Sequence, residues 1–185
     1  MRLVRQDDKL PVKNIDVTQG DAIRFKHSKL LPNSIRAIIV GPSNCGKTNV
    51  LITLLEHPNG IKFENVYVYS KSLHQPKYEH LKKVLSNIEG IGYHTFSENS
   101  VVLPPEEAKR NSVFVFDDIA CERQNHVRSY FCMGRHKDID SFYLGQSYTR
   151  IPKHLVRDNA NFLIIFKQDN LNLKHIYDDH INTDI

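Results

Sequence analysis

Residues 35–55, IRAIIVGPSNCGKTNVLITLL, constrain the fold of this chain more than any other stretch. A β-branched run at residues 38–40 leads in, and apolar residues at positions 50, 51, 54 and 55 follow at helical spacing. Between them the sequence matches G-x-x-x-x-G-K-[ST], the pattern of a phosphate-binding loop, at Gly41, Gly46, Lys47 and Thr48. The stretch therefore predicts a strand, a glycine-rich turn and a helix in immediate succession.

The predicted turn has the chemistry to hold the phosphates of a nucleotide. Consecutive backbone N–H groups form a concave anion site, and the N-terminus of the following helix adds partial positive charge. Lys47 would reach the β- and γ-phosphates, and the Thr48 hydroxyl would bind Mg²⁺. The predicted nucleotide-binding residues are Gly41, Pro42, Ser43, Asn44, Cys45, Gly46, Lys47, Thr48 and Asn49. The alternative is a glycine turn that joins a strand to a helix and binds nothing.

Length and composition favour one intracellular domain. A chain of 185 residues is long enough for one substantial core, and its formal charge of +4 permits an acidic partner such as nucleic acid without requiring one. Three cysteines without metal-binding spacing indicate a reducing compartment. The charged N-terminus is unlike a signal peptide, and no apolar run is long enough to span a membrane. We therefore expect a soluble, intracellular protein.

The rest of the chain alternates between predicted strands and helices. Strands are predicted at residues 66–70, 93–96, 112–118, 140–146 and 161–166, and helices at 73–88 and 152–159. This alternation predicts an α/β fold, a central, mostly parallel sheet flanked by helices, with the ligand site at the carboxyl ends of the strands. Residues 1–33 are expected to form a lead-in flap with a hairpin at 15–25, and residues 34–185 the domain. The last eleven residues show no clear element, which suggests a chain cut from something longer.

Polar residues end two of the predicted strands. Asp117 and Asp118 follow a continuous apolar run, and Gln146 ends the strand at 140–146. Phosphoryl transfer to water needs a metal holder and a group that orients or deprotonates the water. We expect Asp117 to hold Mg²⁺ with Thr48, Asp118 to act as general base, and Gln146 to contact the γ-phosphate or the water. The alternatives are solvated acids that cap the next helix, and an amide that satisfies loop backbone.

The order of these motifs, GPSNCGKT, SKSLHQPKYEHL, VFVFDD, GRHKDIDSFYLGQS and IPKHLVRDNANFLIIFKQD, resembles the genome-packaging ATPases of poxvirus-like large DNA viruses and Maverick/Polinton-type elements, within the HerA/FtsK superfamily. The resemblance implies an ASCE, RecA-like P-loop fold and an ATPase that requires ATP and Mg²⁺. It further implies a homo-oligomeric ring that translocates double-stranded DNA into a capsid, with a capsid or portal-like protein as partner and no membrane. Such a protein would act in a viral factory in the cytoplasm or nucleus and be present in the virion.

The resemblance also points to two arginines. In a ring ATPase, an arginine from the neighbouring subunit typically completes the charge stabilisation of the transition state. The resemblance places Arg135 first and Arg157 second for this role. On the predicted helix at 152–159, Lys153 and Arg157 would share one face, where they could contact DNA phosphates. The alternative for each residue is an ordinary solvated charge.

Two rival functions remain open from the sequence. The first is a non-catalytic nucleotide-binding protein with a structural or regulatory role, derived from such a motor. The family's acidic motif commonly ends Asp-Glu, where this chain has Asp117 and Asp118. The second is a GTPase, because residues 167–169, KQD, mimic the end of a guanine-specifying N-K-x-D motif. Phe166 replaces the asparagine of that motif, and no switch glycine follows the two acids.

Overall fold

A computed structural model describes residues 25–97, 101–119, 125–154 and 156–181 of the 185-residue chain. The predicted hairpin at residues 15–25 lies almost wholly outside the described residues, as does most of the predicted flap. None of the helices in the described ranges is long and apolar enough to cross a membrane.

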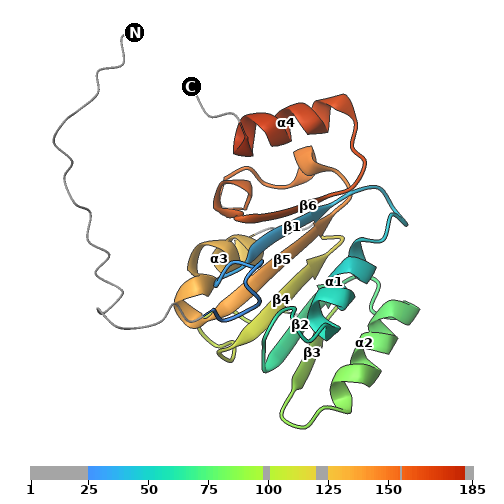
Figure 1. The fold of residues 1–185 in the computed structure, drawn as a ribbon, viewed down its shortest axis with the longest axis vertical. Helices are drawn as coiled ribbons and strands as arrows, with labels where there is room; N and C mark the ends of the chain where they lie inside the picture. The colour runs from blue at the N-terminus through green and yellow to red at the C-terminus, as the bar shows by residue number, and fades with distance from the viewer. Residues whose placement is uncertain (1–24, 98–100, 120–124, 155, 182–185) are drawn as a thin grey trace, which may run out of the picture.

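The centre of the molecule is a six-stranded sheet in which every pairing is parallel (Figure 1). Its strands are β1 (Arg36–Val40), β2 (Asn65–Ser70), β3 (Gly92–Phe96), β4 (Ser112–Asp117), β5 (Ile139–Gly145) and β6 (Phe162–Ile165). They are arranged in the order β3-β2-β4-β5-β1-β6. The five strands expected after the phosphate loop are all present, so the prediction of a mostly parallel sheet is confirmed. Strand β5 separates β1 from β4, as expected of an ASCE-type fold.

Helices cover both faces of the sheet (Figure 1). On one face lie α1 (Lys47–Glu56) and α2 (Pro76–Ser86), whose apolar residues pack against β1, β2, β4 and β5. On the other face, α3 (Asn125–Met133) and α4 (Asn170–His180) contribute to a second cluster of buried side chains. Because both faces are covered, the central strands are continuous apolar runs rather than alternating ones. This burial fixes the sheet that carries the site.

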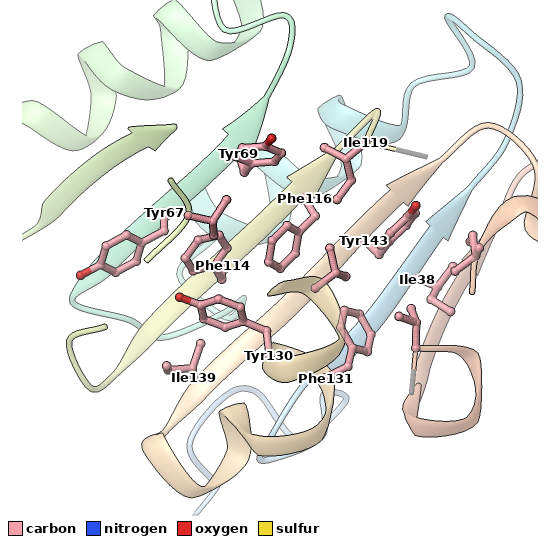
Figure 2. Close-up of a cluster of buried hydrophobic side chains, with 14 of the residues drawn as sticks. Ile38, Tyr67, Tyr69, Phe114, Phe116, Ile119, Tyr130, Phe131, Ile139 and Tyr143 are labelled. Carbon is pink, nitrogen blue, oxygen red and sulfur yellow. The ribbon is translucent and has the colours of Figure 1, made fainter. Parts of the chain in front are cut away.

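Aromatic rings hold β4 in place on the α3 face of the sheet (Figure 2). The ring centroid of Phe114 lies 4.1 Å from that of Tyr130 on α3, 5.4 Å from that of Tyr67 on β2 and 4.7 Å from that of Phe116. Aromatic pairs at such separations add stabilisation beyond the area that they bury. They therefore stiffen the strand whose carboxyl end carries Asp117.

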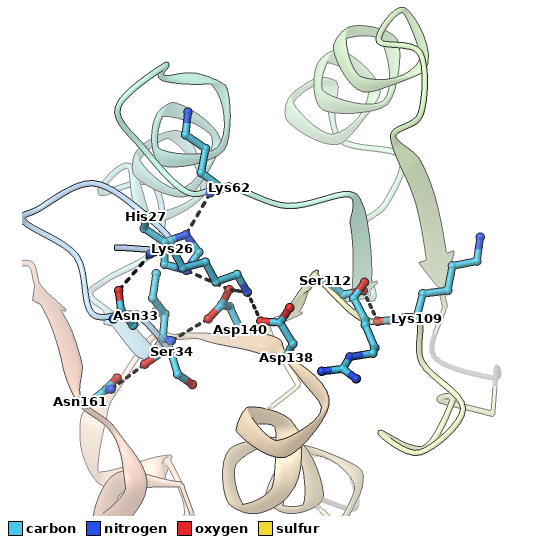
Figure 3. A network of polar contacts seen from close by, with 12 residues as sticks. Lys26, His27, Asn33, Ser34, Lys62, Lys109, Ser112, Asp138, Asp140 and Asn161 are labelled. Atoms are coloured by element: carbon cyan, nitrogen blue, oxygen red, sulfur yellow. Dashed lines mark hydrogen bonds and ion pairs between the residues drawn. The ribbon is translucent and has the colours of Figure 1, made fainter. Parts of the chain in front are cut away.

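A network of polar contacts ties the lead-in segment to the amino edge of the sheet (Figure 3). Asp140, whose side chain is 1% exposed, accepts hydrogen bonds from the backbone of Ile35 at 2.7 Å and from Lys26 Nζ at 2.9 Å. The Nε2 atom of His27 lies 3.1 Å from the same carboxylate, and Lys26 also binds Asp138. Buried charges of this kind are tolerated when paired and hydrogen-bonded. Residues 26 and 27, at the end of the predicted flap, thus contact the sheet directly.

Two elements differ from the sequence prediction. Within the predicted helix at 152–159, the described residues before Val156 form a turn, and Arg157–Asn159 form a short 3-10 helix in place of the longer helix. The successive residues Val156 and Arg157 are both buried, whereas a surface helix buries residues three or four apart. The chain also has a C-terminal element, α4, which the sequence reading missed. Only Asn172 and Ile176 of α4 are fully buried, so its apolar periodicity is weak, and the side chain of Asp169 caps its start.

Candidate active site

The phosphate loop connects β1 to α1 in a conformation that depends on Gly46. This residue directly precedes the helix with φ at +103°, a left-handed conformation that costs glycine little. Lys47, the first residue of α1, turns back over the loop, and its Nζ donates to the carbonyl oxygens of Gly41 at 2.7 Å and of Pro42 at 2.9 Å. The ammonium group therefore already lies at the mouth of the predicted anion site.

Gly41 is required for close packing. A Cβ atom at this position would lie 2.5 Å from Cβ of Phe166 and 2.7 Å from Sγ of Cys45, closer than carbon side chains approach. The backbone N–H of Gly41 donates to the carbonyl of Gly145 at the end of β5, and that of Phe166 donates to the carbonyl of Val40. The loop is thus held by the ends of β5 and β6. The sequence reading missed this role of Phe166, which it saw only as a departure from a guanine motif.

The two acids, Asp117 and Asp118, lie at the carboxyl end of β4 and line the same cleft. Asp117 ends the strand, and its Oδ2 accepts a hydrogen bond from the hydroxyl of Tyr78 on α2. Successive strand residues point to opposite faces, but Asp118 has φ at +56°, which ends the strand and allows its side chain to line the same cleft. The Oδ1 atom of Asp118 accepts a hydrogen bond from Gln146 Nε2 at 3.0 Å. The predicted base and the predicted amide are therefore in direct contact.

These residues converge on one cleft of about 110 Å³ at the carboxyl edge of the sheet. Its walls are formed by Ser43, Asn44, Lys47, Thr48, Ser72, Gln75, Lys77, Asp117, Asp118, Leu144 and Gln146. The loop, both acids and the amide are thus brought together, as the sequence reading expected of an active site. The other five predicted loop residues, Gly41, Pro42, Cys45, Gly46 and Asn49, belong to the same turn and its helix without lining the cleft.

One wall of the cleft was not anticipated. Ser72, Gln75 and Lys77 come from the loop after β2 and from the first turn of α2, where Pro76 occupies the first helical position. Pro76 indicated where the predicted helix at 73–88 begins, because proline is favoured in the first turn of a helix. The parallel β2–β4 pairing, with Ser70 opposite Asp117, brings this helix end to the acids. Sequence spacing alone does not give that pairing.

The electrostatics of the cleft suit a cation beside Asp117. Burial raises the pKa of the Asp117 carboxyl above its ordinary value. The Tyr78 hydrogen bond opposes this rise, the charge of Asp118 adds to it, and the charges of Lys47 and Lys77 lower the pKa again. A carboxylate whose charge is disfavoured by burial and by a neighbouring acid gains from a bound cation.

The donor set fits a nucleotide with Mg²⁺. The described ranges contain no group of three or more His, Cys, Asp or Glu residues that could hold a metal ion by themselves. Magnesium sites in proteins that bind nucleotides typically use one or two carboxylates together with substrate phosphates. Thr48 and Asp117 line the cleft together with Ser43, Asn44 and Lys47 of the loop. These residues match that requirement.

The two predicted arginines do not lie at this cleft. Arg135 is exposed in a 3-10 helix, Gly134–Lys137, that precedes β5 at the amino edge of the sheet. Arg157 is buried, its NH1 lies 2.9 Å from Asp179 Oδ2, and its guanidinium lies 4.9 Å from the centroid of the Tyr148 ring. Lys153 Nζ lies 3.5 Å from the same Asp179 carboxylate. The expectation that Lys153 and Arg157 share an exposed helical face is therefore wrong, and Arg157 fixes α4 instead.

The residue that suggested a guanine-specifying motif has a structural role. Asp169 precedes α4, and its Oδ1 accepts hydrogen bonds from the backbone N of Asn172 at 2.8 Å and from Asn172 Nδ2 at 3.0 Å. A side chain of this type that caps a helix typically contributes about 1 kcal/mol to helix stability. The carboxylate is thus already engaged, and the structure gives the GTPase alternative no support.

The phosphate loop after β1, the acids after β4 and the strand between them define a P-loop NTPase. The sequence matches the model of the family described as poxvirus A32 protein over residues 22–181. The chain belongs to this family, which confirms the resemblance to poxvirus-like proteins.

Solved structures with the same fold come from Sulfolobus turreted icosahedral viruses. The genome packaging NTPase B204 of virus 2 in complex with sulfate is 11% identical, with a TM-score of 0.58 over 81% of this chain and 82% of that one. Its complex with ATP-gammaS is 12% identical, with a TM-score of 0.52 over 80% and 82%. B204 described as the DNA-packaging ATPase is 15% identical, with a TM-score of 0.54 over 78% and 81%. At such identities these likenesses show the fold alone. No curated protein matches this chain.

Proposed function

We propose that this chain is an ATPase subunit of a motor that translocates double-stranded DNA during viral or transposon genome packaging. The observation that carries the proposal is the convergence of Lys47, Thr48, Asp117, Asp118 and Gln146 on one cleft. Membership of the poxvirus A32 protein family supports it. The fold is shared with a genome packaging NTPase solved with AMP, AMPPCP and ATP-gammaS, which supports ATP as the nucleotide.

In the proposed reaction, the loop residues bind and orient ATP. Lys47 exchanges its two carbonyl partners in the loop for the β- and γ-phosphate oxygens, so its charge is available without a large movement of the backbone. Thr48 and Asp117 would hold Mg²⁺, which would neutralise charge on the phosphate oxygens. Preorganised positive charge of this kind stabilises the transition state most where water is excluded.

Asp118, the acid that follows Asp117, activates the attacking water. Asp118 accepts the proton of the water as general base, and Gln146 holds its carboxylate through the 3.0 Å hydrogen bond from Nε2. The remaining polar atoms of Gln146 are then available to the γ-phosphate or to the water. The family commonly has glutamate at this position, and aspartate is one carbon shorter. The hydrogen bond from Gln146 fixes the place of this shorter side chain.

The motor function requires partners beyond one chain. We propose a homo-oligomeric ring in which Arg135 of each subunit approaches the ATP of its neighbour, because its place at the amino edge keeps it away from the cleft of its own chain. Double-stranded DNA and a capsid or portal-like protein are the proposed partners, in a viral factory and in the virion. A nucleotide-binding protein that does not turn over remains the alternative.

Turnover assays test the proposal. Purified protein is assayed with ATP or GTP, with Mg²⁺ or EDTA, and with or without double-stranded DNA. We expect Mg²⁺-dependent hydrolysis of ATP that DNA stimulates, and loss of activity in EDTA. Binding of ATP without turnover under any of these conditions would favour the non-catalytic alternative, and preference for GTP would favour a GTPase.

A further inference from the structure

Tyr78 is a buried tyrosine whose hydroxyl contacts Asp117, one of the two acids of the cleft. It is the third residue of α2, is 1% exposed and packs in the core between α2 and the sheet. Its hydroxyl donates to Asp117 Oδ2, since a carboxylate can only accept. The sequence pattern alone predicts no role for Tyr78 in the site.

A second polar side chain lies close to the tyrosine hydroxyl. Ser70, at the end of β2, neighbours Tyr78 and pairs with Asp117 in the sheet register. Ser70 is 1% exposed, and its Oγ accepts a hydrogen bond from the backbone N of Ser72 at 3.1 Å. The buried surroundings of the hydroxyl restrict its rotation, and the bond from Tyr78 restricts the rotation of the Asp117 carboxylate.

The hydrogen bond from Tyr78 fixes the orientation of the Asp117 carboxylate. One of its two oxygens is engaged by Tyr78, and the carboxylate faces the cleft beside Thr48 and Lys47. Residues that hydrogen-bond to a metal ligand fix its orientation and strengthen its binding to the metal. A phenylalanine would fill the same core volume but leave Asp117 free to rotate.

We propose that Tyr78 is a positioning residue that holds the Asp117 carboxylate in the orientation that binds Mg²⁺ with the nucleotide. The inference rests on the proposed binding of Mg²⁺ and ATP at this cleft. It assigns α2 a part in the site, since the tyrosine joins the first turn of that helix to the carboxyl end of β4.

The test compares Tyr78→Phe with Tyr130→Phe. Tyr130 is also fully buried and its hydroxyl also donates to one partner, the carbonyl of Leu103 at 2.7 Å, but it lies on the opposite face of the sheet. Calorimetric titration with AMPPCP, in EDTA and across a series of Mg²⁺ concentrations, measures binding without turnover. Thermal unfolding of each variant measures how much stability is lost when the hydroxyl is removed.

We expect Tyr78→Phe to raise the Mg²⁺ concentration needed for half-maximal enhancement of AMPPCP binding about tenfold, at the low end of the range for partners of metal ligands. Affinity in EDTA should match that of the wild type, and Tyr130→Phe should leave both quantities unchanged. Ser70→Ala should shift the Mg²⁺ requirement in the same direction by less. This variant decides the question if Tyr78→Phe does not fold.

Three results would overturn the inference. An unchanged Mg²⁺ requirement in Tyr78→Phe, or in Ser70→Ala where only that variant folds, would show that Tyr78 only packs the core. Equal shifts in Tyr78→Phe and Tyr130→Phe would show a general effect of lost stability. Both results leave the proposed function standing, provided that Mg²⁺ strengthens AMPPCP binding to the wild type. A wild type that does not bind AMPPCP with Mg²⁺ would remove the proposed function together with this inference.

Discussion

At the scale of single residues, Lys47 combines a structural and a chemical task. Its ammonium group donates hydrogen bonds to two carbonyl oxygens of the loop, those of Gly41 and Pro42. Phosphate binding replaces these two neutral acceptors by charged ones, and the attraction between opposite charges then adds to each hydrogen bond. The same side chain thus shapes the loop before binding and carries charge during the reaction.

Replacement of this lysine tests the phosphate loop. We expect Lys47→Ala to lower ATP turnover by about a hundredfold or more, because the charge on the transferred phosphoryl group is no longer stabilised. Steady-state turnover with saturating Mg²⁺ measures the effect, and Lys82→Ala, an exposed lysine on α2, is the matched control. Near-normal hydrolysis by Lys47→Ala would contradict the assignment.

The two acids should separate binding from chemistry. Asp117→Asn removes the charge that we assign to Mg²⁺ and should weaken Mg²⁺-dependent nucleotide binding. Asp118→Asn should bind nucleotide nearly as the wild type does and lose hydrolysis, because asparagine can still accept the hydrogen bond from Gln146 but cannot take a proton. Titrations with and without Mg²⁺, beside turnover rates, distinguish the two. Normal binding and turnover in both variants would leave the acids with structural roles only.

At the scale of elements, α4 is attached by a buried cluster of charges. Asp179 on α4 accepts from the hydroxyl of Tyr148 at 2.9 Å and pairs with Arg157, and His180 Nε2 lies 2.7 Å from the same hydroxyl. Burial lowers the pKa of His180, and the negative charge of Asp179 opposes this effect. The cluster compensates for the small apolar contribution of α4, whose only buried hydrophobic residue is Ile176.

Removal of this acid tests the cluster. Asp179→Ala leaves Arg157 as a buried charge without its partner, and breaking a buried ion pair in this way costs about 3–5 kcal/mol. We expect a fall in Tm of about 6 °C or more, from the 2–4 °C per kcal/mol typical of chains of this size. Thermal unfolding measures it, with Asp178→Ala, the exposed neighbouring aspartate, as the control. Equal effects of the two substitutions would show that the ion pair contributes little.

Sequence reasoning predicted the elements that a strong local pattern defines. The strand, loop and helix at residues 35–55 combine β-branched residues, glycines and helical spacing in one short stretch, and β4 is a continuous apolar run that ends in acids. The amphipathic pattern of α4 is weak because polar and charged contacts, not apolar burial, attach it. The buried Arg157 looked like a surface charge, since its partner Asp179 lies 22 residues further along the chain.

The candidate site was also predictable where it depends on local sequence pattern. Lys47, Thr48, Asp117, Asp118 and Gln146 were recognised because each follows a strand that the sequence defines, and parallel strands bring their carboxyl ends to one edge. The wall formed by residues 72, 75 and 77 was not recognised, nor was the hydroxyl of Tyr78. Their places depend on which strands are neighbours, and strand order is a property of the tertiary fold.

At the scale of the whole molecule, the position of Arg135 decides how a ring would work. It precedes β5, a strand of seven residues that spans about 23 Å at 3.3 Å per residue before the chain reaches the cleft. An arginine side chain is far shorter than this distance. Arg135 can therefore serve an ATP site only if that site belongs to another subunit.

Mixing experiments test this prediction. Arg135→Ala should bind ATP and hydrolyse it about a thousandfold more slowly, the typical contribution of an arginine supplied in trans. Mixed with Asp118→Asn subunits, it should regain part of the activity, because some interfaces then combine an intact Asp118 with an intact Arg135. Arg110→Ala, another exposed arginine, is the control. Absence of rescue, with turnover independent of protein concentration, would mean that the site is complete within one chain.

The polar network around Asp140 has a practical consequence. It fixes residues 26 and 27 at the amino edge of an all-parallel sheet, while the cleft opens at the carboxyl edge. A fluorophore or bead handle coupled at Phe25 is therefore separated from the cleft by the length of β5, about 23 Å at 3.3 Å per residue. Attachment at this point leaves every residue that lines the cleft unmodified, so single-molecule measurements of this chain can use it.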